Sequence, residues 1–400
     1  MLIDYFKERI CAGGYVTLTN QEYDYVMEHF DKESIVNCFM VVFASNRSKA
    51  SVFKDITLEK VEAKYKKLVN STNDYINTDG AEILMKHQYN FGINNCLGVI
   101  QLGHYYNDVS NYFHIENRMN CGGYDRISPS QIWNGEGLID KEWMKLLRGF
   151  LSPLFRSVND KRQITVHEYR FCFRLSSTVY SAAQFKPEVA KIIIEKFSRN
   201  GNVIDFSSGW GDRLAGFHAS SNGTFYFGAD PNQALQEGYT EQMLRYKSWG
   251  STKQSVIVKL PAEDVKWGEY KYFDLVFTSP PYFATELYAK GETFEELQSW
   301  SRYKEYEVWR DKFLFKSIEN IIPSLSTQAT FAINIFDINI KKEVYHVCED
   351  LYNFMQSKGF NYKGYVGMRM KQKPKNIDDN KNKSYMASYY VEPIWIFSNY

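Results

Sequence analysis

The residues with the clearest chemical potential are Ser279, Pro280, Pro281 and Tyr282, which directly follow the apolar run FDLVFT. Two consecutive prolines remove two N–H donors and fix the backbone, so that carbonyl oxygens can face a cleft. Hydrogen bonds from a planar amino group to such carbonyls draw its nitrogen toward tetrahedral geometry, which frees the lone pair to attack a methyl sulfonium. The tyrosine ring offers a surface on which a flipped base can stack. The turn predicts methylation of an exocyclic amino nitrogen, although S-P-P-Y away from a strand end is commonly only a turn.

A second stretch, VIDFSSGWGDRLAG at residues 203–216, indicates a buried strand, a turn of small residues and the start of a helix. Glycines permit a tight turn and a close approach of a ligand to the backbone. An acid ends the strand, where ligands bind in open α/β sheets. The residues of this stretch that we expect to bind a cofactor are Asp205, Ser207, Ser208, Gly209, Trp210 and Gly211.

Acids also follow the next two expected strands. Asp230 ends YFGAD at about the spacing of a ribose-binding acid, and Pro231 follows it. The same aspartate could instead cap a helix, because proline is favoured at the first helical position. Glu263 and Asp264 in KLPAEDV stand where an adenine amino group could donate a hydrogen bond. We include all four residues among the expected cofactor contacts.

Other nucleotide and nucleophile sites do not fit this turn. The sequence has no G-x-x-x-x-G-K-[ST] phosphate loop, and Phe206 occupies the first glycine position of a G-x-S-x-G turn around Ser208. A dinucleotide site would need a third glycine where Arg213 and Leu214 stand. A methyl donor fits better than a nicotinamide cofactor because it has no pyrophosphate to hold.

Strand and helix patterns alternate from about residue 165 onward, which predicts an α/β fold with a mostly parallel sheet. Five β/α units followed by two terminal strands are the element count of the seven-stranded, Rossmann-like class I methyltransferase sheet. The expected strands are Val203–Phe206, Phe225–Asp230, Ser255–Leu260, Phe273–Thr278, Thr330–Phe336, Tyr362–Met370 and Val391–Phe397. The expected helices are Pro187–Phe197, Asp212–Ser220, Asn232–Ser248, Phe294–Ile322 and Lys342–Lys358.

These motifs resemble those of the DNA amino methyltransferases, which act on adenine N6 or cytosine N4. DFSSGWG matches the family's cofactor loop, and S-P-P-Y matches its catalytic D/N/S-P-P-Y/F/W motif. The stretch QFKPEVAKIIIEKF resembles the family helix that touches the methionine moiety, which implies cofactor contacts from Phe185, Lys186 and Pro187. The resemblance covers roughly residues 165–400 and implies S-adenosylmethionine as the cofactor.

Two departures leave the target base open. Serine at position 279 is commoner in the cytosine-N4 branch, yet that branch usually places its catalytic motif before its cofactor loop, whereas here the loop comes first. Trp210 and the doubled serine also replace the more usual pattern. The expected function is methyl transfer to a nucleic-acid base, DNA foremost. The alternatives are an RNA or other amino methyltransferase, and a non-catalytic nucleic-acid-binding protein that retains the fold.

We expect two domains, a candidate target-recognition region at residues 1–165 and the methyltransferase domain at residues 166–400. The alternating stretch Ile164–Leu175 predicts a half-buried strand, and Arg170 and Arg174 on one of its faces could contact substrate, as could Phe283 beside the catalytic turn. The lysines of Thr57–Leu68 favour a solvated helix face over a phosphate contact, and Arg369–Lys383 fits a phosphate-gripping loop and a solvated loop equally.

Composition sets outer limits on function. The net charge of +1 does not by itself indicate a polyanion partner, and the 16% aromatic content fits a core as well as base stacking. Six cysteines form no C-x-x-C pair or zinc spacing, so we expect reduced thiols and no metal. With no signal peptide or long apolar run expected, the sequence predicts a soluble, cytoplasmic protein without a membrane partner. The oligomeric state stays open.

Overall fold

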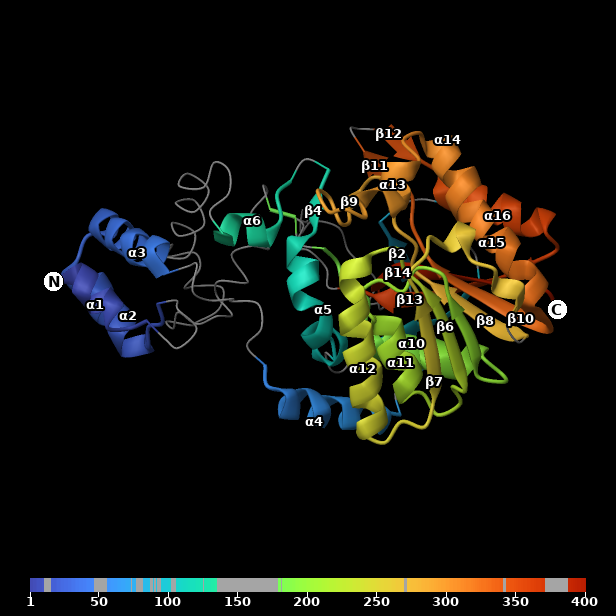
Figure 1. The fold of residues 1–400 in the computed structure, drawn as a ribbon, viewed down its shortest axis with the longest axis horizontal. Helices are drawn as coiled ribbons and strands as arrows, with labels where there is room; N and C mark the ends of the chain where they lie inside the picture. The colour runs from blue at the N-terminus through green and yellow to red at the C-terminus, as the bar shows by residue number, and fades with distance from the viewer. Residues whose placement is uncertain are drawn as a thin grey trace. The chain divides into compact units, whose positions relative to one another are not determined.

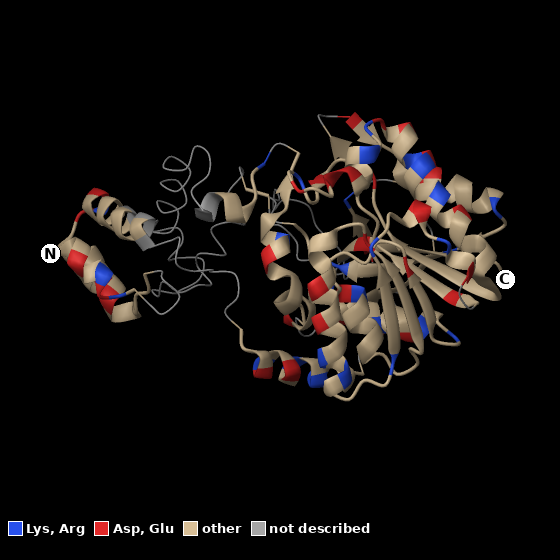
Figure 2. Cartoon of the chain, in the orientation of Figure 1, with Lys and Arg blue, Asp and Glu red and all other residues tan. Residues whose placement is uncertain are grey.

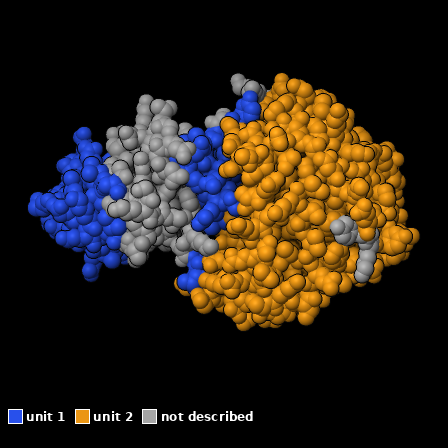
Figure 3. Space-filling view, in the orientation of Figure 1, with its two compact units in different colours: residues 1–57, 115–183 blue, residues 58–114, 184–400 orange. Residues whose placement is uncertain are grey.

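The computed structural model describes residues 1–10, 16–46, 56–72, 74–76, 82–86, 89, 91, 95–101, 106–124, 126–134, 179–180, 182–269, 272–340, 343–370 and 388–400. Its contacts divide the chain into two compact units (Figure 3). One unit comprises residues 1–57 and 115–183, and the other comprises residues 58–114 and 184–400. Residues 58–114 therefore belong with the large sheet of the second unit, although they precede the expected domain boundary.

The seven expected strands are present and lie in one sheet in the order β7-β6-β5-β8-β10-β14-β13. Neighbouring strands from β7 to β10 are parallel, and β14 is antiparallel to both β10 and β13. The expected Rossmann-like α/β class is confirmed. The strand bounds are β5 Asn202–Asp205, β6 Phe225–Ala229, β7 Gln254–Val258, β8 Phe273–Thr278, β10 Leu325–Asn334, β13 Asn361–Arg369 and β14 Ser388–Ser398.

Strand order reverses between β5 and β8, because the chain passes from β5 to β6 on one side and returns to β8 on the other. In open α/β sheets, such a reversal leaves a crevice beyond the carboxyl ends of the strands, where ligands bind. Every residue of β8 is buried. The reversal therefore places the turn after β5 and the turn after β8 side by side at one edge of the sheet.

Three further strands extend this sheet beyond the seven expected ones. β3 (Cys96–Ile100) pairs in parallel with β13, β1 (Tyr75–Ile76) pairs with β3, and β2 (Glu82–Met85) pairs with the start of β14. β13 contains buried apolar residues, including Tyr365, Val366 and Met368, and β3 pairs with the edge of β13. The short strands were missed because polar residues and glycines interrupt their local pattern.

Helices α10, α11 and α12 lie on one side of the sheet, and α14, α15 and α16 lie on the other (Figure 1). Helix α4, expected at residues 57–68, joins the first group, because its Tyr65 donates a hydrogen bond to the His218 carbonyl oxygen and stacks on Tyr246. The bounds in this unit are α4 Leu58–Val69, α10 Pro187–Phe197, α11 Asp212–Ala219, α12 Gln236–Ser248, α13 Ser299–Arg302, α14 Tyr306–Trp309, α15 Lys316–Ile321 and α16 Val347–Ser357; helix α5 spans Asp108–Asn120.

Two helix predictions were wrong in extent. The single helix expected at Phe294–Ile322 is broken, because Gln298, Tyr303 and Glu305 adopt extended backbone angles. Its pieces are the 3-10 turn η5 (Glu295–Leu297), α13, α14, the π-helical turn η6 (Arg310–Phe315) and α15. The helix expected from Lys342 begins at Val347 instead, after the hairpin of β11 (Ile338–Ile340) and β12 (Glu343–Tyr345).

The remaining elements of this unit are short. The 3-10 turns are η2 Gln233–Leu235, η3 Ala262–Asp264, η4 Trp267–Glu269 and η7 Ile322–Ser324, and β9 spans Glu286–Leu287. The other unit contains α1 Leu2–Lys7, α2 Asn20–His29, α3 Lys32–Asn46, α6 Pro129–Asn134 and β4 Gly122–Gly123. None of the helices in the described ranges has the length and apolarity needed to cross a membrane.

A buried carboxylate at the start of β8 holds the connection into β5. Asp274, 1% exposed, accepts hydrogen bonds from the backbone N–H groups of Arg199, Asn200 (2.7 Å) and Asn202 (2.9 Å) and from the Ser198 hydroxyl. The carboxylate thus joins the end of α10, the connecting loop and β8.

We expect Asp274→Ala to lower the free energy of unfolding by about 3 kcal/mol, because each unsatisfied buried donor costs roughly 1–3 kcal/mol. Urea unfolding followed by circular dichroism measures the change. Glu241→Ala, which removes an exposed ion pair with Arg245, serves as the control and should change stability by less than about 1 kcal/mol. Equal losses in the two variants would contradict the role given to Asp274.

Candidate functional site

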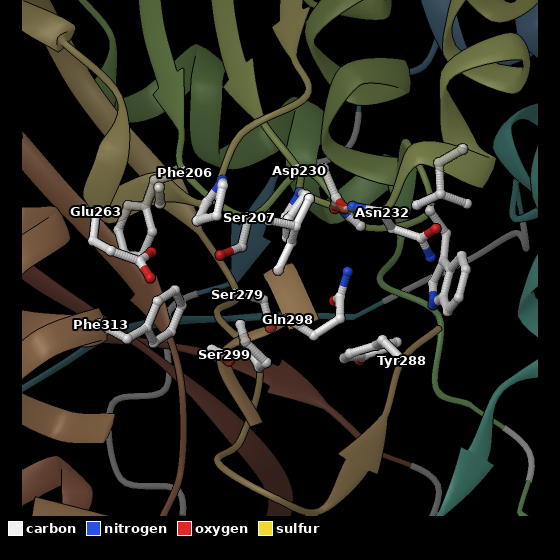
Figure 4. A pocket seen from close by; sticks show the side chains of 18 residues that line it. Phe206, Ser207, Asp230, Asn232, Glu263, Ser279, Tyr288, Gln298, Ser299 and Phe313 are labelled. Atoms are coloured by element: carbon white, nitrogen blue, oxygen red, sulfur yellow. Dashed lines mark hydrogen bonds between the residues drawn. The ribbon is translucent and has the colours of Figure 1, made fainter. Parts of the chain in front are cut away.

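A pocket lies beyond the carboxyl ends of β5, β6, β7 and β8 (Figure 4). It encloses about 590 Å³ including its open side, a size typical of small-molecule sites. Five stretches of the chain and two single residues, Tyr288 and Phe313, contribute to its lining, which combines aromatic and proline surfaces with a few polar groups. The lining residues are Phe206, Ser207, Gly209, Trp210, Asp230, Pro231, Asn232, Leu235, Pro261, Ala262, Glu263, Ser279, Pro281, Tyr288, Leu297, Gln298, Ser299 and Phe313.

The turn after β5 needs both of its glycines. Gly209 and Gly211 have φ angles of 57° and 71°, a region that other residues seldom adopt. A Cβ atom on Gly211 would also lie 2.2 Å from the Gln242 Oε1 atom. Between them, Trp210 is 6% exposed and its ring packs against that of Tyr288 at 5.7 Å. The turn therefore presents backbone at Gly209 and a ring at Trp210 to the pocket.

Asp205, expected to contact the cofactor, lies beneath the turn and is fully buried. Its Oδ2 atom accepts hydrogen bonds from Arg213 Nε (2.7 Å) and the Tyr226 hydroxyl (2.6 Å). Its Oδ1 atom accepts from the Thr278 hydroxyl (2.9 Å) and the Ser207 N–H (3.3 Å). Burial, together with the Asp205 charge, raises the pKa of Tyr226 well above its ordinary value, so this phenol stays a donor. Asp205 thus holds the site together from below.

Asp230 lines the pocket with a carboxylate that is 8% exposed. Its two oxygens accept hydrogen bonds from the N–H groups of Gly209 (2.8 Å) and Asn232 (2.9 Å). Burial raises the pKa of Asp230 to about 6. Asn232, and not Asp230, caps the following 3-10 turn, because its side chain accepts from the Ala234 N–H at 3.2 Å. The carboxylate therefore ties the turn after β5 to the end of β6 at the pocket wall.

The two acids after β7 have different environments. Glu263 lines the pocket at 7% exposure, and its Oε1 atom accepts from Arg302 Nη1 (2.7 Å) and the Tyr303 hydroxyl (2.9 Å). Burial raises the pKa of Glu263. The Asp264 side chain is 48% exposed, pairs with Arg302 at 2.8 Å and does not belong to the lining. Of the two expected adenine contacts, the structure brings only Glu263 to the pocket.

Two buried polar atoms of the lining have no hydrogen-bond partner among the described residues. They are Oε2 of Glu263, an acceptor, and Nε2 of Gln298, a donor. Gln298 is 5% exposed, and Figure 4 shows its amide extending into the middle of the pocket. Buried polar groups are almost always hydrogen-bonded, so an unpaired donor and an unpaired acceptor indicate a polar ligand. No local pattern marks Gln298 as a site residue, because the sequence predicts a continuous helix there.

The turn after β8 brings Ser279 and Pro281 into the same lining, while Pro280 is buried. The Pro281 carbonyl oxygen accepts from the Phe283 N–H at 3.1 Å, which closes the turn on itself. The Tyr282 ring lies 4.5 Å from that of Phe336, tilted by 34°. Burial raises the pKa of Tyr282 well above its ordinary value. Ser279 and Pro281 therefore face the pocket, and Tyr282 faces the side toward Phe336.

Phe283, expected to contact substrate, lies instead in the hydrophobic core at 6% exposure. Its ring packs against those of Tyr306, Trp309 and Tyr345 at 6.0, 5.7 and 5.8 Å. Its φ angle of 49° lies in the left-handed region, because the chain reverses there. The Phe283 ring therefore packs in the core and does not line the pocket.

The expected contacts before α10 lie near the turn but outside the lining. The Phe185 ring meets Phe277 edge to face at 5.6 Å and lies 5.4 Å from the Arg213 guanidinium carbon. Pro187 starts α10, and the Lys186 Nζ atom lies 4.0 Å from the Met370 sulfur. Phe185 thus touches the arginine that pairs with Asp205.

Several predictions fall on residues that the structure does not describe. Arg170, Arg174, the strand expected at Ile164–Leu175 and all but the start of Arg369–Lys383 lie outside the described ranges. The lysines of α4 are partly neutralised, since Lys64 pairs with Asp108 and Lys66 with Glu62. Acidic and basic residues are intermixed along the described helices (Figure 2). Within the part of the chain that is described, no three His, Cys, Asp or Glu residues cluster as metal ligands do.

Neither a protein-family model nor a curated protein matches this sequence. Among solved structures, the chain is similar to a methyltransferase from Pyrococcus furiosus, with 14% identity and a TM-score of 0.33 over 54% of this chain and 83% of that one. It is also similar to precorrin-6y C5,15-methyltransferase from Geobacter metallireducens, with 11% identity and a TM-score of 0.33 over 55% and 90% of the two chains. A third is an SAM-dependent O-methyltransferase from Thermotoga maritima, at 11% identity and a TM-score of 0.32 over 54% and 66%. Similarity this low describes part of a fold only.

We expect the buried ion pair between Asp205 and Arg213 to contribute to the stability of the fold. Arg213 is 4% exposed, so Asp205→Ala would leave a buried cation without its partner and should cost about 3–5 kcal/mol. Replacing both residues, as in Asp205→Ala with Arg213→Met, removes the unpaired charge and should recover part of that loss. Urea unfolding of the three proteins measures the difference. If the double variant is no more stable than Asp205→Ala, the buried ion pair is not the source of the effect.

Proposed function

We propose that the protein transfers a methyl group from S-adenosylmethionine to an exocyclic amino nitrogen of a nucleic-acid base, cytosine N4 or adenine N6 of DNA foremost. One observation supports this most strongly. Ser279 and Pro281 of the turn after β8 line the same pocket as Gly209, Trp210 and Asp230. A turn suited to an amino group and a turn suited to a methyl donor therefore share one cavity at the point where the strand order reverses.

The pocket lining suits the nucleoside part of S-adenosylmethionine. The Asp230 carboxylate at the wall can accept hydrogen bonds from ribose hydroxyls, as acids at the end of a second strand commonly do. The unpaired Glu263 Oε2 can accept from the adenine amino group, and the unpaired Gln298 Nε2 can donate to a ligand oxygen or ring nitrogen. Pro231, Ala262 and Phe313 supply the apolar surface that a planar ring requires.

The bound cofactor supplies a methyl group on a positively charged sulfur, which leaves as a neutral thioether. The residues of this chain need only orient the amino nitrogen toward that carbon. The Ser279 hydroxyl oxygen can accept one amino N–H, and the prolines fix the backbone around it. Serine cannot remove a proton as a carboxylate would, so the proton leaves for water once the nitrogen–carbon bond has formed. Turnover then needs no general base at this turn.

A nucleic-acid substrate is favoured by the aromatic character of the turn, where Tyr282 and Phe336 form a ring pair beside Ser279. We propose that residues 1–165 contribute target recognition and that Arg170 and Arg174 contact substrate. An RNA base is the other substrate that the same chemistry would serve.

The test incubates the protein with methyl-labelled S-adenosylmethionine and duplex DNA, single-stranded DNA or RNA, followed by mass spectrometry of the nucleosides. We expect label on N4-methylcytosine or N6-methyladenine. Ser279→Ala should lower the single-turnover rate by about 10- to 100-fold while leaving cofactor affinity unchanged, because it removes one transition-state hydrogen bond. Label on a carbon or oxygen atom, or binding of NAD in preference to S-adenosylmethionine, would overturn the assignment.

Cofactor affinity should depend on pH through Asp230. An ionised carboxylate accepts hydroxyl hydrogen bonds better than a protonated one, so affinity should weaken as the pH falls through about 6. The sign for stability is opposite: because the folded-state pKa lies above that of the unfolded chain, this residue's contribution favours folding at low pH and is lost as the pH rises toward 6.

Calorimetry with S-adenosylmethionine between pH 5 and 8 measures the effect. Asp230→Asn should weaken binding by about 1.5–3 kcal/mol at pH 8 and flatten the pH profile. Asp311→Asn, at an exposed helical position, is the control and should keep the wild-type profile. An unchanged affinity in Asp230→Asn would show that the carboxylate only ties the two turns together.

A further inference from the structure

The last residue of β10, Asn334, connects the catalytic turn to β14. It is 2% exposed and stands one position beyond Ile333, which pairs with Thr278 of β8. Its Nδ2 atom donates to the Pro393 carbonyl oxygen and to Glu392 Oε1, both at 3.0 Å. Both amide protons are therefore engaged by acceptors of the neighbouring strand.

These two bonds fix the orientation of the amide. Turning it over would place Oδ1 against the Pro393 carbonyl oxygen, which has no proton to donate. The Asn334 Oδ1 atom must therefore face the catalytic turn. There it accepts from the Ser279 hydroxyl at 3.3 Å, with the Tyr282 hydroxyl at 3.5 Å.

The orientation of Asn334 limits the hydrogen bonds that the Ser279 hydroxyl can make. A hydroxyl has one proton to donate and two lone pairs that accept. Because Asn334 offers only an acceptor on this side, the Ser279 hydroxyl donates its proton to Asn334 Oδ1. Even if the Tyr282 hydroxyl, 3.5 Å away, donates to Ser279 Oγ, one lone pair of the serine is left for the pocket. A ring nitrogen without hydrogen or a carbonyl oxygen would then meet an acceptor, whereas an amino N–H meets a partner.

We propose that Asn334 is a positioning residue that keeps Ser279 a hydrogen-bond acceptor and thereby selects substrates whose reacting nitrogen carries an N–H. This inference rests on the proposed function and deepens it. Asn334 does not belong to the pocket lining and acts through Ser279. The carboxylate of Glu392 and the carbonyl of Pro393 in turn hold Asn334.

A double-mutant cycle on single-turnover methyl transfer tests the proposal. We expect Ser279→Ala and Asn334→Ala each to slow transfer by about 10- to 100-fold. If Asn334 acts through Ser279, the double variant should be no slower than Ser279→Ala alone, since the shared interaction is already lost. Additive losses would overturn the proposal, because they would show that Asn334 acts independently of the serine.

A second variant separates positioning from packing. In Asn334→Asp, one carboxyl oxygen can accept the Ser279 proton while the other, protonated where it faces Pro393 and Glu392, donates to the Pro393 carbonyl oxygen. This variant should therefore transfer methyl faster than Asn334→Ala. A merely structural role predicts the reverse order, because a buried new carboxyl group costs more stability than a small cavity. Thr330→Val on the same strand removes a buried hydroxyl that meets Tyr400, and should keep transfer within about twofold of the wild type.

Calorimetry with S-adenosylmethionine accompanies each variant as a check of the folded site. If Asn334→Ala does not fold, Ser279→Ala is compared with the double variant Ser279→Ala, Asn334→Asp. Equal transfer rates of these two proteins support the proposal, and unequal rates overturn it. Absence of transfer by the wild-type protein to any amino-bearing base would refute the proposed function itself, an outcome distinct from additivity in the cycle.

Discussion

The buried carboxylate of Asp205 is the contact on which the rest of the site depends. It receives hydrogen bonds from α11 through Arg213, from β6 through Tyr226 and from β8 through Thr278. Thr278 is followed directly by Ser279, and Ser207 of the turn after β5 donates to the same carboxylate oxygen as Thr278. One charged group thus sets the spacing between the turn that would hold a methyl donor and the turn that would hold an amino group.

The three acids around the pocket, Asp205, Asp230 and Glu263, have different roles. Asp205 is saturated by protein donors and cannot also serve a ligand well, so its contribution is positional. Asp230 accepts hydrogen bonds from two backbone N–H groups at the pocket wall, and its oxygens keep lone pairs for further donors. Glu263 has one oxygen, Oε2, without a hydrogen-bond partner among the described residues. Burial raises the pKa of both pocket acids, and at Glu263 the ion pair with Arg302 offsets the lost hydration only in part.

The turn after β8 is supported from the other side by β10 and β14. The bonds from Asn334 to Glu392 and Pro393 exist only because the antiparallel strand β14 lies between β10 and β13. A sheet made only of the parallel strands would end at β10 and leave Asn334 without these acceptors. The inserted strand therefore has a chemical role as well as a packing role, since it decides which way the Asn334 amide faces.

The sequence alone determined the elements with strong local patterns. The buried strand before Ser279, the glycine turn after β5 and the strand-ending acids all follow from apolar periodicity and turn chemistry, and the strand count of the parallel part followed with them. Whatever depends on distant residues required the tertiary structure. Local pattern could not show that Asp205 is saturated by Arg213, Tyr226 and Thr278, or that Phe283 turns into the core. Nor could it show that strands from residues 75–100 extend the sheet, that a broken helix brings Gln298 into the pocket, or that Asn334 orients Ser279. The physical reason is the same throughout: hydrogen-bond partners far apart in the chain depend on which elements pack together. Local periodicity shows which face of an element is buried, but it does not show which distant element covers that face.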